Sequence, residues 1–334
     1  MSKLVRLHLF SVALMSALLL LGCMPIRPIV KDQAGRELPL LNELVASAEV
    51  VAQAGESFTL PWDATPDANG EWIYFTAATA AGGAVLRVPA AGGEVTVVAS
   101  GAPLVTPQGL TISTTGDRIY VADPSAPGDT GQVGQIWQVT IATGEVTPLT
   151  GATGTAPHNL TLASEAGQEV IYFAGVDPTD GQAALLKLAM DSGAALTVLY
   201  KGAPLVAPEG IAVTQAGVVY VADRAAGGED SGKVFRWQEG KLEAIADHFR
   251  PGQFVGAALT ADDGGLLIST LEPRSATAQV LVINLASLET GIINAVIGAN
   301  QGSGGIHRAA AGATFAWADL TDGHKGKVYK VSPP

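Results

Sequence analysis

Two stretches of the chain are nearly identical, and they differ at a residue that could take part in chemistry. GAPLVTPQGLTI covers 101–112 and GAPLVAPEGIAV covers 202–213, so Gln108 in the first copy corresponds to Glu209 in the second. A carboxylate can accept hydrogen bonds, hold a cation or transfer a proton, whereas an amide only donates and accepts hydrogen bonds. The repeat therefore keeps its surroundings constant and varies the functional group that precedes the glycine.

The same position, which we call the slot, can be followed through the other repeats. It is occupied by Trp62, His158 and Val255 and, where the spacing slips, by Gly304 or Gly305. A position with a purely structural role would keep one residue type, so its variety indicates contact with a ligand. Convergent polar groups in a concave site are the first place to expect binding. With the polar residues that follow the slot in two repeats, the predicted ligand-binding residues are Trp62, Asp63, Gln108, His158, Asn159 and Glu209.

Recurring apolar segments show which elements must position the slot. They follow one another at intervals of about 48 residues, the length of a four-stranded propeller blade. The chain also has 40 glycines and no sustained helical pattern after residue 50, which favours short strands joined by tight turns. We therefore predict an all-β fold, a six-bladed β-propeller over 47–334. The six segments are WIYFTA (72–77), RIYVAD (118–123), VIYFAG (170–175), VVYVAD (218–223), LLIST (266–270) and TFAWAD (314–319).

The order of strands within one unit predicts where the slot lies. In the second unit, an inner strand at 109–113 precedes strands at 118–122, 134–139 and 144–149. The second strand is apolar on both faces, as expected when each blade is stacked between two neighbours. The start of the first strand and the end of the second are antiparallel neighbours. The slot is therefore expected at one mouth of the central channel.

The two ends of the chain are predicted to close the ring together. The last unit stops after GKVYKV (326–331), and AEVVAQAGES (48–57) matches the fourth-strand pattern of GEVTVVASGA (93–102). The N-terminal strand then completes the sixth blade, which leaves no long unpaired edge.

Acidic residues that end the second strands are interpreted as structural. Asp123, Asp223 and Asp319 occupy one repeat position, and short acidic side chains there accept N–H bonds from the loop that follows. The segments after them and after the third blade's second strand are rich in acids and glycine without a calcium-binding spacing. We expect flexible, solvated loops at 123–131, 177–181, 223–232 and 319–326.

The N-terminus is predicted to be an export signal; the alternative is an uncleaved membrane anchor, which is disfavoured because the apolar run is shorter than the roughly 20 residues of a spanning helix. Lys3 and Arg6 precede an apolar run that ends in LLGC, so residues 1–22 are predicted to be a lipoprotein signal peptide and Cys23, the only cysteine, to carry the lipid. Residues 23–46 are then a tether between the lipid and the propeller. We expect an exported monomer anchored to the cell membrane or the outer membrane. A net charge of -12 argues against nucleic acid as a partner.

The motifs P-x-G-[LI] and YVAD resemble the NHL and YVTN propeller repeats, and the six-fold count over 47–334 resembles the senescence marker protein/gluconolactonase family. In that family the residue before the first-strand glycine supplies metal ligands. The resemblance implies Glu209 and Asp63 as ligands of calcium or zinc, with Gln108 or Asn159 assisting and His158 or His307 near the reacting group. This chain departs from the pattern in its first blade, because Trp62 stands where the family has a glutamate.

Three functions are compatible with this pattern. The leading one is a binding module that takes a small molecule or a peptide at the channel mouth. The first alternative is a metal-dependent lactonase of the gluconolactonase type, and the second is a structural scaffold of the cell envelope. The residues leave open whether the protein is an enzyme.

Overall fold

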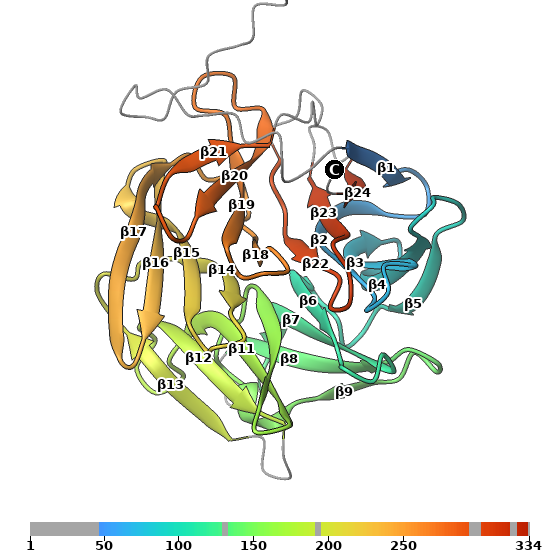
Figure 1. The fold of residues 1–334 in the computed structure, drawn as a ribbon. Helices are drawn as coiled ribbons and strands as arrows, with labels where there is room; N and C mark the ends of the chain where they lie inside the picture. The colour runs from blue at the N-terminus through green and yellow to red at the C-terminus, as the bar shows by residue number, and fades with distance from the viewer. Residues whose placement is uncertain (1–46, 129–132, 191–194, 294–301, 321–325, 333–334) are drawn as a thin grey trace, which may run out of the picture. The chain divides into compact units, whose positions relative to one another are not determined.

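The structure is a computed structural model that describes residues 47–128, 133–190, 195–293, 302–320 and 326–332. These residues form six four-stranded antiparallel sheets, and the sheets are arranged as blades around a centre (Figure 1). The six-bladed β-propeller predicted from the sequence is confirmed. The predicted signal peptide, Cys23 and tether lie outside the described residues. Within the described residues, no helix has the length and hydropathy needed to cross a bilayer.

Each blade contributes one strand to each of four concentric positions. The innermost strands contact one another in sequence around the ring, and the last of them contacts the first. They are β2 (Thr59–Pro66), β6 (Gly109–Ile112), β10 (Leu160–Glu165), β14 (Pro208–Val213), β18 (Ala257–Leu259) and β22 (Ile306–Arg308). The second strands are β3 (Trp72–Thr79), β7 (Arg118–Pro127), β11 (Gln168–Val176), β15 (Val219–Gly228), β19 (Gly265–Leu271) and β23 (Phe315–Asp319).

The outer half of each blade is built in the same way. The third strands are β4 (Gly82–Pro89), β8 (Val133–Thr140), β12 (Ala183–Ala189), β16 (Ser231–Gln238), β20 (Ala278–Asn284) and β24 (Lys327–Ser332). The fourth strands are β5 (Thr96–Ser100), β9 (Val146–Pro148), β13 (Leu196–Lys201), β17 (Lys241–Phe249), β21 (Thr290–Ile292) and β1 (Ser47–Gln53). A 3-10 turn, Thr150–Ala152, follows β9.

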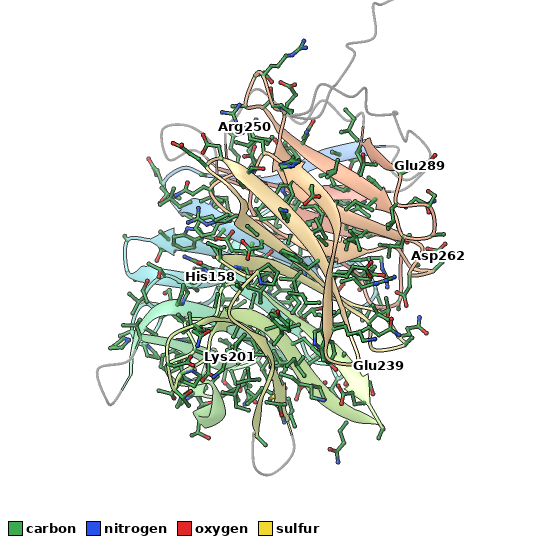
Figure 2. All side chains as sticks on the ribbon, turned by 90° about the vertical axis from the view of Figure 1, so that its left-hand side faces the viewer. His158, Lys201, Glu239, Arg250, Asp262 and Glu289 are labelled. Atoms are coloured by element: carbon green, nitrogen blue, oxygen red, sulfur yellow. The ribbon has the colours of Figure 1, made fainter. Side chains whose placement is uncertain are left out.

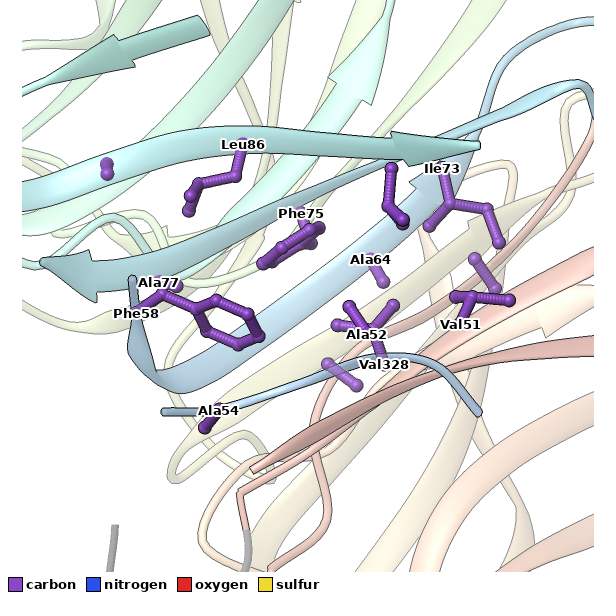
Figure 3. Packing of buried hydrophobic residues seen from close by; sticks show 14 of the residues in the cluster. Val51, Ala52, Ala54, Phe58, Ala64, Ile73, Phe75, Ala77, Leu86 and Val328 are labelled. Carbon is purple, nitrogen blue, oxygen red and sulfur yellow. The ribbon is translucent and has the colours of Figure 1, made fainter. Parts of the chain in front are cut away.

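The ring closes through the chain's two ends, as predicted. β1 pairs with β24 from Ser47↔Ser332 to Gln53↔Lys327, and the Ala54 N–H donates to the Gly326 carbonyl at 2.8 Å. The strand also brings apolar side chains into the core between the sixth and first blades, including Val51, which lies in one cluster with Phe75 (Figure 3). Burial of these side chains, together with the strand pairing, holds the sixth blade to the first.

The second strands are buried on both faces because each blade packs between two others. In β7, Ile119 and Val121 pack toward the first blade, whereas Tyr120 and Ala122 pack toward the third. Separate clusters of this kind lie between successive blades. The stacking fixes the inner strands in place, and with them the slot.

The prediction of flexible loops at 123–131 and 223–232 is wrong where the second strands continue into these segments. β7 continues past Asp123 to Pro127, which pairs with Val133. β15 likewise continues to Gly228, which pairs with Ser231, so 223–232 is largely a hairpin. In both blades the pairing resumes beyond a register shift, and in the fourth blade Glu229 and Asp230 form the turn that joins β15 to β16.

The other two predicted loops differ from each other. The segment 177–181 is an ordered turn, in which the Gly181 N–H donates to the Asp177 carbonyl at 2.8 Å. The buried Asp177 carboxylate forms an ion pair with Lys201, so this acidic residue has a structural partner. In 319–326, residues 321–325 lie outside the described residues.

Candidate functional site

All six predicted ligand-binding residues line one small cavity at the end of the channel where the inner strands begin. We call it the mouth cavity, and its volume is about 10 Å³, the space of a single water molecule. Figure 2 shows His158 on the side opposite Glu239, Asp262 and Glu289, which lie in or beside turns at the other end. The lining of the mouth cavity consists of Trp62, Asp63, Gln108, His158, Asn159, Glu209, Phe254, Val255 and Gly305.

The local fold explains why these residues meet. Trp62 and Asp63 lie in β2 and Glu209 lies in β14. Gln108 stands directly before β6, and His158 and Asn159 are the two residues before β10. Inner strands that run in the same direction around the channel bring equivalent positions to the same level. Gly305 rather than Gly304 lines the cavity in the sixth blade.

His158 and Gln108 are joined across two blades. The His158 Nδ1 lies 2.8 Å from the Gln108 Oε1. Burial, and then the nearby Arg224 guanidinium, lower the pKa of His158 to about 4, so the imidazole is neutral at pH 7. A neutral imidazole has one donor and one acceptor. Because Nδ1 donates to the Gln108 oxygen, Nε2 is left as an acceptor.

Asn159 supplies a second acceptor. Its Oδ1 is buried and has no hydrogen-bond partner within the described residues. A buried acceptor without a partner costs about 1–3 kcal/mol. The site therefore has two acceptors from the third blade, His158 Nε2 and Asn159 Oδ1, that a donor could satisfy.

Glu209 is more buried than its predicted place at a channel mouth suggests. Its side chain is only 6% exposed; Oε1 lies 2.9 Å from the Arg224 Nε, and Oε2 accepts the Val255 N–H at 3.0 Å. Burial raises the pKa of Glu209 to about 8, although Arg224 and the Val255 N–H both favour the charged form. The carboxyl group can therefore gain or lose a proton near neutral pH.

Asp63 connects three blades. It accepts the Ala64 N–H at 2.8 Å, the Leu110 N–H of the second blade at 2.9 Å, and a bond from His307 Nε2 of the sixth blade at 2.9 Å. The carboxyl group is almost completely buried. A Cβ on Gly305 would lie 1.7 Å from the Asp63 Oδ1, which explains why the sixth blade has glycine here.

The donor set does not fit the divalent cation that the family resemblance implies. The Asp63 oxygens accept two backbone N–H groups and the His307 bond, and the Glu209 oxygens accept Arg224 and a backbone N–H. A divalent cation such as calcium needs several oxygen ligands, including anionic ones that are not already neutralised. No cluster of three or more His, Cys, Asp or Glu side chains suited to a metal occurs within the described ranges.

The structural interpretation of the second-strand aspartates is confirmed for two of the three. Asp123 accepts the N–H groups of Val105 and Thr106, and Asp223 accepts those of Val206 and Ala207. These donors lie in the loops before the inner strands, which was not predicted. The two aspartates thereby fix the position of Gln108 and Glu209 along the central channel. Asp223 also accepts the N–H groups of Ala225 and Ala226 at 3.0 Å, in the segment that follows it, as predicted.

The third aspartate behaves differently. Neither carboxylate oxygen of Asp319 has a hydrogen-bond partner in the part of the chain that the structure describes. Burial raises the pKa of Asp319 to about 7, and Lys327 opposes the shift. The shared repeat position thus does not give the three residues one role.

Sequence reasoning missed two residues of the site. Phe254 lines the mouth cavity, and Arg224 balances Glu209. Both stand next to positions that the repeat singled out, because Phe254 precedes Val255 and Arg224 follows Asp223. Their own types are not repeated, so the period did not reveal them.

Comparisons with known proteins support the fold alone. No protein-family model and no curated protein matches the chain. Among solved structures, a gluconolactonase from Xanthomonas campestris is 16% identical, with a TM-score of 0.58, over 92% of this chain and 94% of that one. A virginiamycin B lyase from Staphylococcus aureus is 13% identical, with a TM-score of 0.55, over 86% and 100%. A putative glucose dehydrogenase from Thermus thermophilus is 11% identical, with a TM-score of 0.56, over 85% and 99%.

Proposed function

We propose that this propeller is a binding module that accepts the donor group of a small ligand or peptide at the mouth cavity. The observation that carries the proposal is the buried, unpartnered Asn159 Oδ1 beside the neutral His158. A bound donor would remove the cost of the unmet acceptor, and a site with an unmet polar group discriminates strongly between ligands that have the matching group and ligands that lack it.

The size and charge of the site narrow the ligand. The mouth cavity has room for one small group, so a single ammonium or hydroxyl enters while the rest of the ligand lies outside. Trp62 and Phe254 supply aromatic walls, which attract cations. The net charge of -12 steers cations toward the protein. The aromatic walls and the net charge favour a primary amine over a neutral alcohol, whereas the Arg224 guanidinium opposes this preference when Glu209 is protonated.

Calorimetric titration of the full chain with simple probes tests this proposal. We expect ethanolamine and a lysine-containing tripeptide to bind, and their N-acetylated forms to bind at least about tenfold more weakly, because each lost hydrogen bond to a charged group costs about 1.5–3 kcal/mol. Asn159→Leu should weaken binding of the amines to a similar extent. Gln215→Ala, at an exposed residue outside the mouth cavity, is the control. Equal binding by amines and acetylated amines would contradict the proposal.

The lactonase alternative has less support. The two carboxylates that line the mouth cavity, Asp63 and Glu209, already accept hydrogen bonds from protein, and the likeness to a gluconolactonase at 16% identity extends to the fold only. A scaffold role has no contact or surface in its favour among the described residues.

We also propose that the binding module acts at the cell envelope through a lipid on Cys23. This rests on the LLGC sequence after an apolar run. Cys23→Ser should move the protein from the membrane fraction to the soluble fraction, and unchanged fractionation would contradict lipidation.

A further inference from the structure

The central channel has a second cavity at the end opposite the mouth. Its volume is about 400 Å³, and it is lined by the ends of all six inner strands and by the turns that follow them. His307 lines this second cavity, whereas its partner Asp63 lines the mouth cavity. The 2.9 Å bond between them therefore lies between the two cavities. The sequence analysis placed no site at this end.

One level of the second cavity is lined by three threonines, two alanines and one histidine. The strand registers place six residues at equivalent positions, because their partners occupy one repeat position in the second strands. The first three blades present hydroxyl groups, the fourth and fifth present methyl groups, and the sixth presents an imidazole. In blade order the residues are Thr65, Thr111, Thr161, Ala212, Ala258 and His307.

The hydroxyl groups are available to a ligand. Thr65 and Thr111 are buried, at 4% and 8% exposure, yet neither they nor Thr161 form a side-chain hydrogen bond to protein within the described ranges. By contrast, the Ser113 hydroxyl at the edge of the same cavity donates to Asp117 at 3.0 Å. The three threonines line the cavity without a protein partner for their hydroxyl groups, so water or the hydroxyl groups of a ligand can bond to them there.

The charges at the rim of the second cavity balance. Arg308 and Asp263 both line it, and burial lowers the pKa of Arg308 while the nearby Asp263 carboxylate opposes the shift. The Arg308 Nε donates to the Leu259 carbonyl at 3.1 Å, and Asp263 accepts the Gln215 N–H at 2.8 Å. One cation and one anion of this kind do not select a charged ligand. The site is therefore matched to a neutral molecule.

We propose that the second cavity binds a small, neutral, polyhydroxylated molecule. Threonine hydroxyls both donate and accept, which suits ligand hydroxyls, and the alanine side of the ring suits the carbon face of the same molecule. A volume of about 400 Å³ lies within the range of small-molecule sites. The proposal is independent of ligand binding at the mouth, because the two cavities share no lining residue.

Calorimetric titration of the full chain with D-glucose, myo-inositol and D-mannitol tests the proposal. We expect saturable binding of at least one of them. The double variant Thr111→Val/Thr161→Val keeps the side-chain shape and removes two hydroxyls, and it should weaken binding by about tenfold. Ala258→Leu fills the apolar side and should abolish binding. His158→Phe changes only the mouth cavity and should leave binding unchanged.

Several outcomes would overturn the proposal. One is the absence of saturable heat for all three polyols. Another is a rise in melting temperature that is equal in the wild type and the threonine double variant, which is the general effect of excluded osmolytes. A third is loss of binding in His158→Phe with none in the double variant, which would place the polyol at the mouth. If Ala258→Leu fails to fold, the nearly isosteric threonine variant still decides the question.

Discussion

The two ends of the central channel are built on the same six inner strands, yet they differ in room and in chemistry. At the mouth, large and unlike side chains such as Trp62, His158 and Glu209 converge and leave about 10 Å³. A few residues further along the strands, threonine and alanine leave about 400 Å³. The strands set the diameter of the channel, and the size of the side chains at each level determines how much free volume remains inside it.

The comparison also separates residues that hold the ring from residues that present a functional group. Asp63 connects three blades, whereas His158 has one side-chain bond, to Gln108. The same cavity wall thus contains structural and available groups. Substitutions should distinguish them by the size of their effect on stability.

The largest effect is expected from opening the ring, which supports both ends of the channel. Deletion of 47–57 removes β1 and the buried Val51, Ala52 and Ala54. We expect a loss of about 3–6 kcal/mol in the free energy of unfolding from lost burial and strand pairing. Deletion of 24–44 is the matched control and should change little. Equal denaturant midpoints for the two truncations would show that β1 does not close the ring.

A smaller but still large effect is expected at the boundary between the cavities. Asp63→Ala leaves His307 and the Leu110 N–H without their buried partner. Each buried donor left without its acceptor costs about 1–3 kcal/mol, and Asp63 accepts from three donors, so urea unfolding should show a loss of about 3–5 kcal/mol. His158→Ala, in the same cavity wall, should cost less than half as much. If the two variants are equally destabilised, Asp63 does not hold the blades together more strongly than His158 does.

Glu209→Gln should give an effect that depends on pH. The folded-state pKa of Glu209 is raised to about 8 from 4.5, so the folded protein keeps a proton that the unfolded chain has lost, and the group's contribution to stability falls as pH rises between these values. The glutamine lacks this dependence. At pH 5, we expect the free energies of unfolding of wild type and variant to differ by less than about 1 kcal/mol. By pH 8.5, the free energy of unfolding of the variant should have risen relative to that of the wild type.

Thermal unfolding across this pH range, with and without added calcium or zinc, checks the Glu209 prediction. A constant difference between the proteins would mean that Glu209 is ionised throughout. Stabilisation of the wild type by metal that disappears in Glu209→Gln would favour the lactonase alternative over the binding module.

The smallest effect on stability is expected at His158, and its pH dependence is opposite to that of Glu209. Its folded-state pKa is lowered to about 4 from 6.5, so its contribution to stability is present above pH 6.5 and is lost as pH falls toward 4. His158→Gln keeps a group that can bond to Gln108 and removes the titration. The melting temperature of the variant should fall less than that of the wild type between pH 7 and pH 4.5. Parallel decreases would show that His158 is not responsible.

Much of this protein follows from the sequence alone. The spacing of about 48 residues predicted the blades, and the alignment of the repeats at the residue before the inner strand predicted that Gln108, His158 and Glu209 lie at one level. The unmatched strand at 48–57 predicted the closure. These features are local or periodic, so each repeat reports on the others without knowledge of the packing.

The tertiary structure alone decided what the site can accept. The burial of Glu209, the joint made by Asp63 with His307, and the second cavity all depend on contacts between blades whose residues are far apart in sequence. Cavity volume depends on a few methyl groups from six blades, and a pKa depends on how completely a carboxyl group is removed from water. A repeat pattern identifies which residues meet but carries no measure of the space or water left between them.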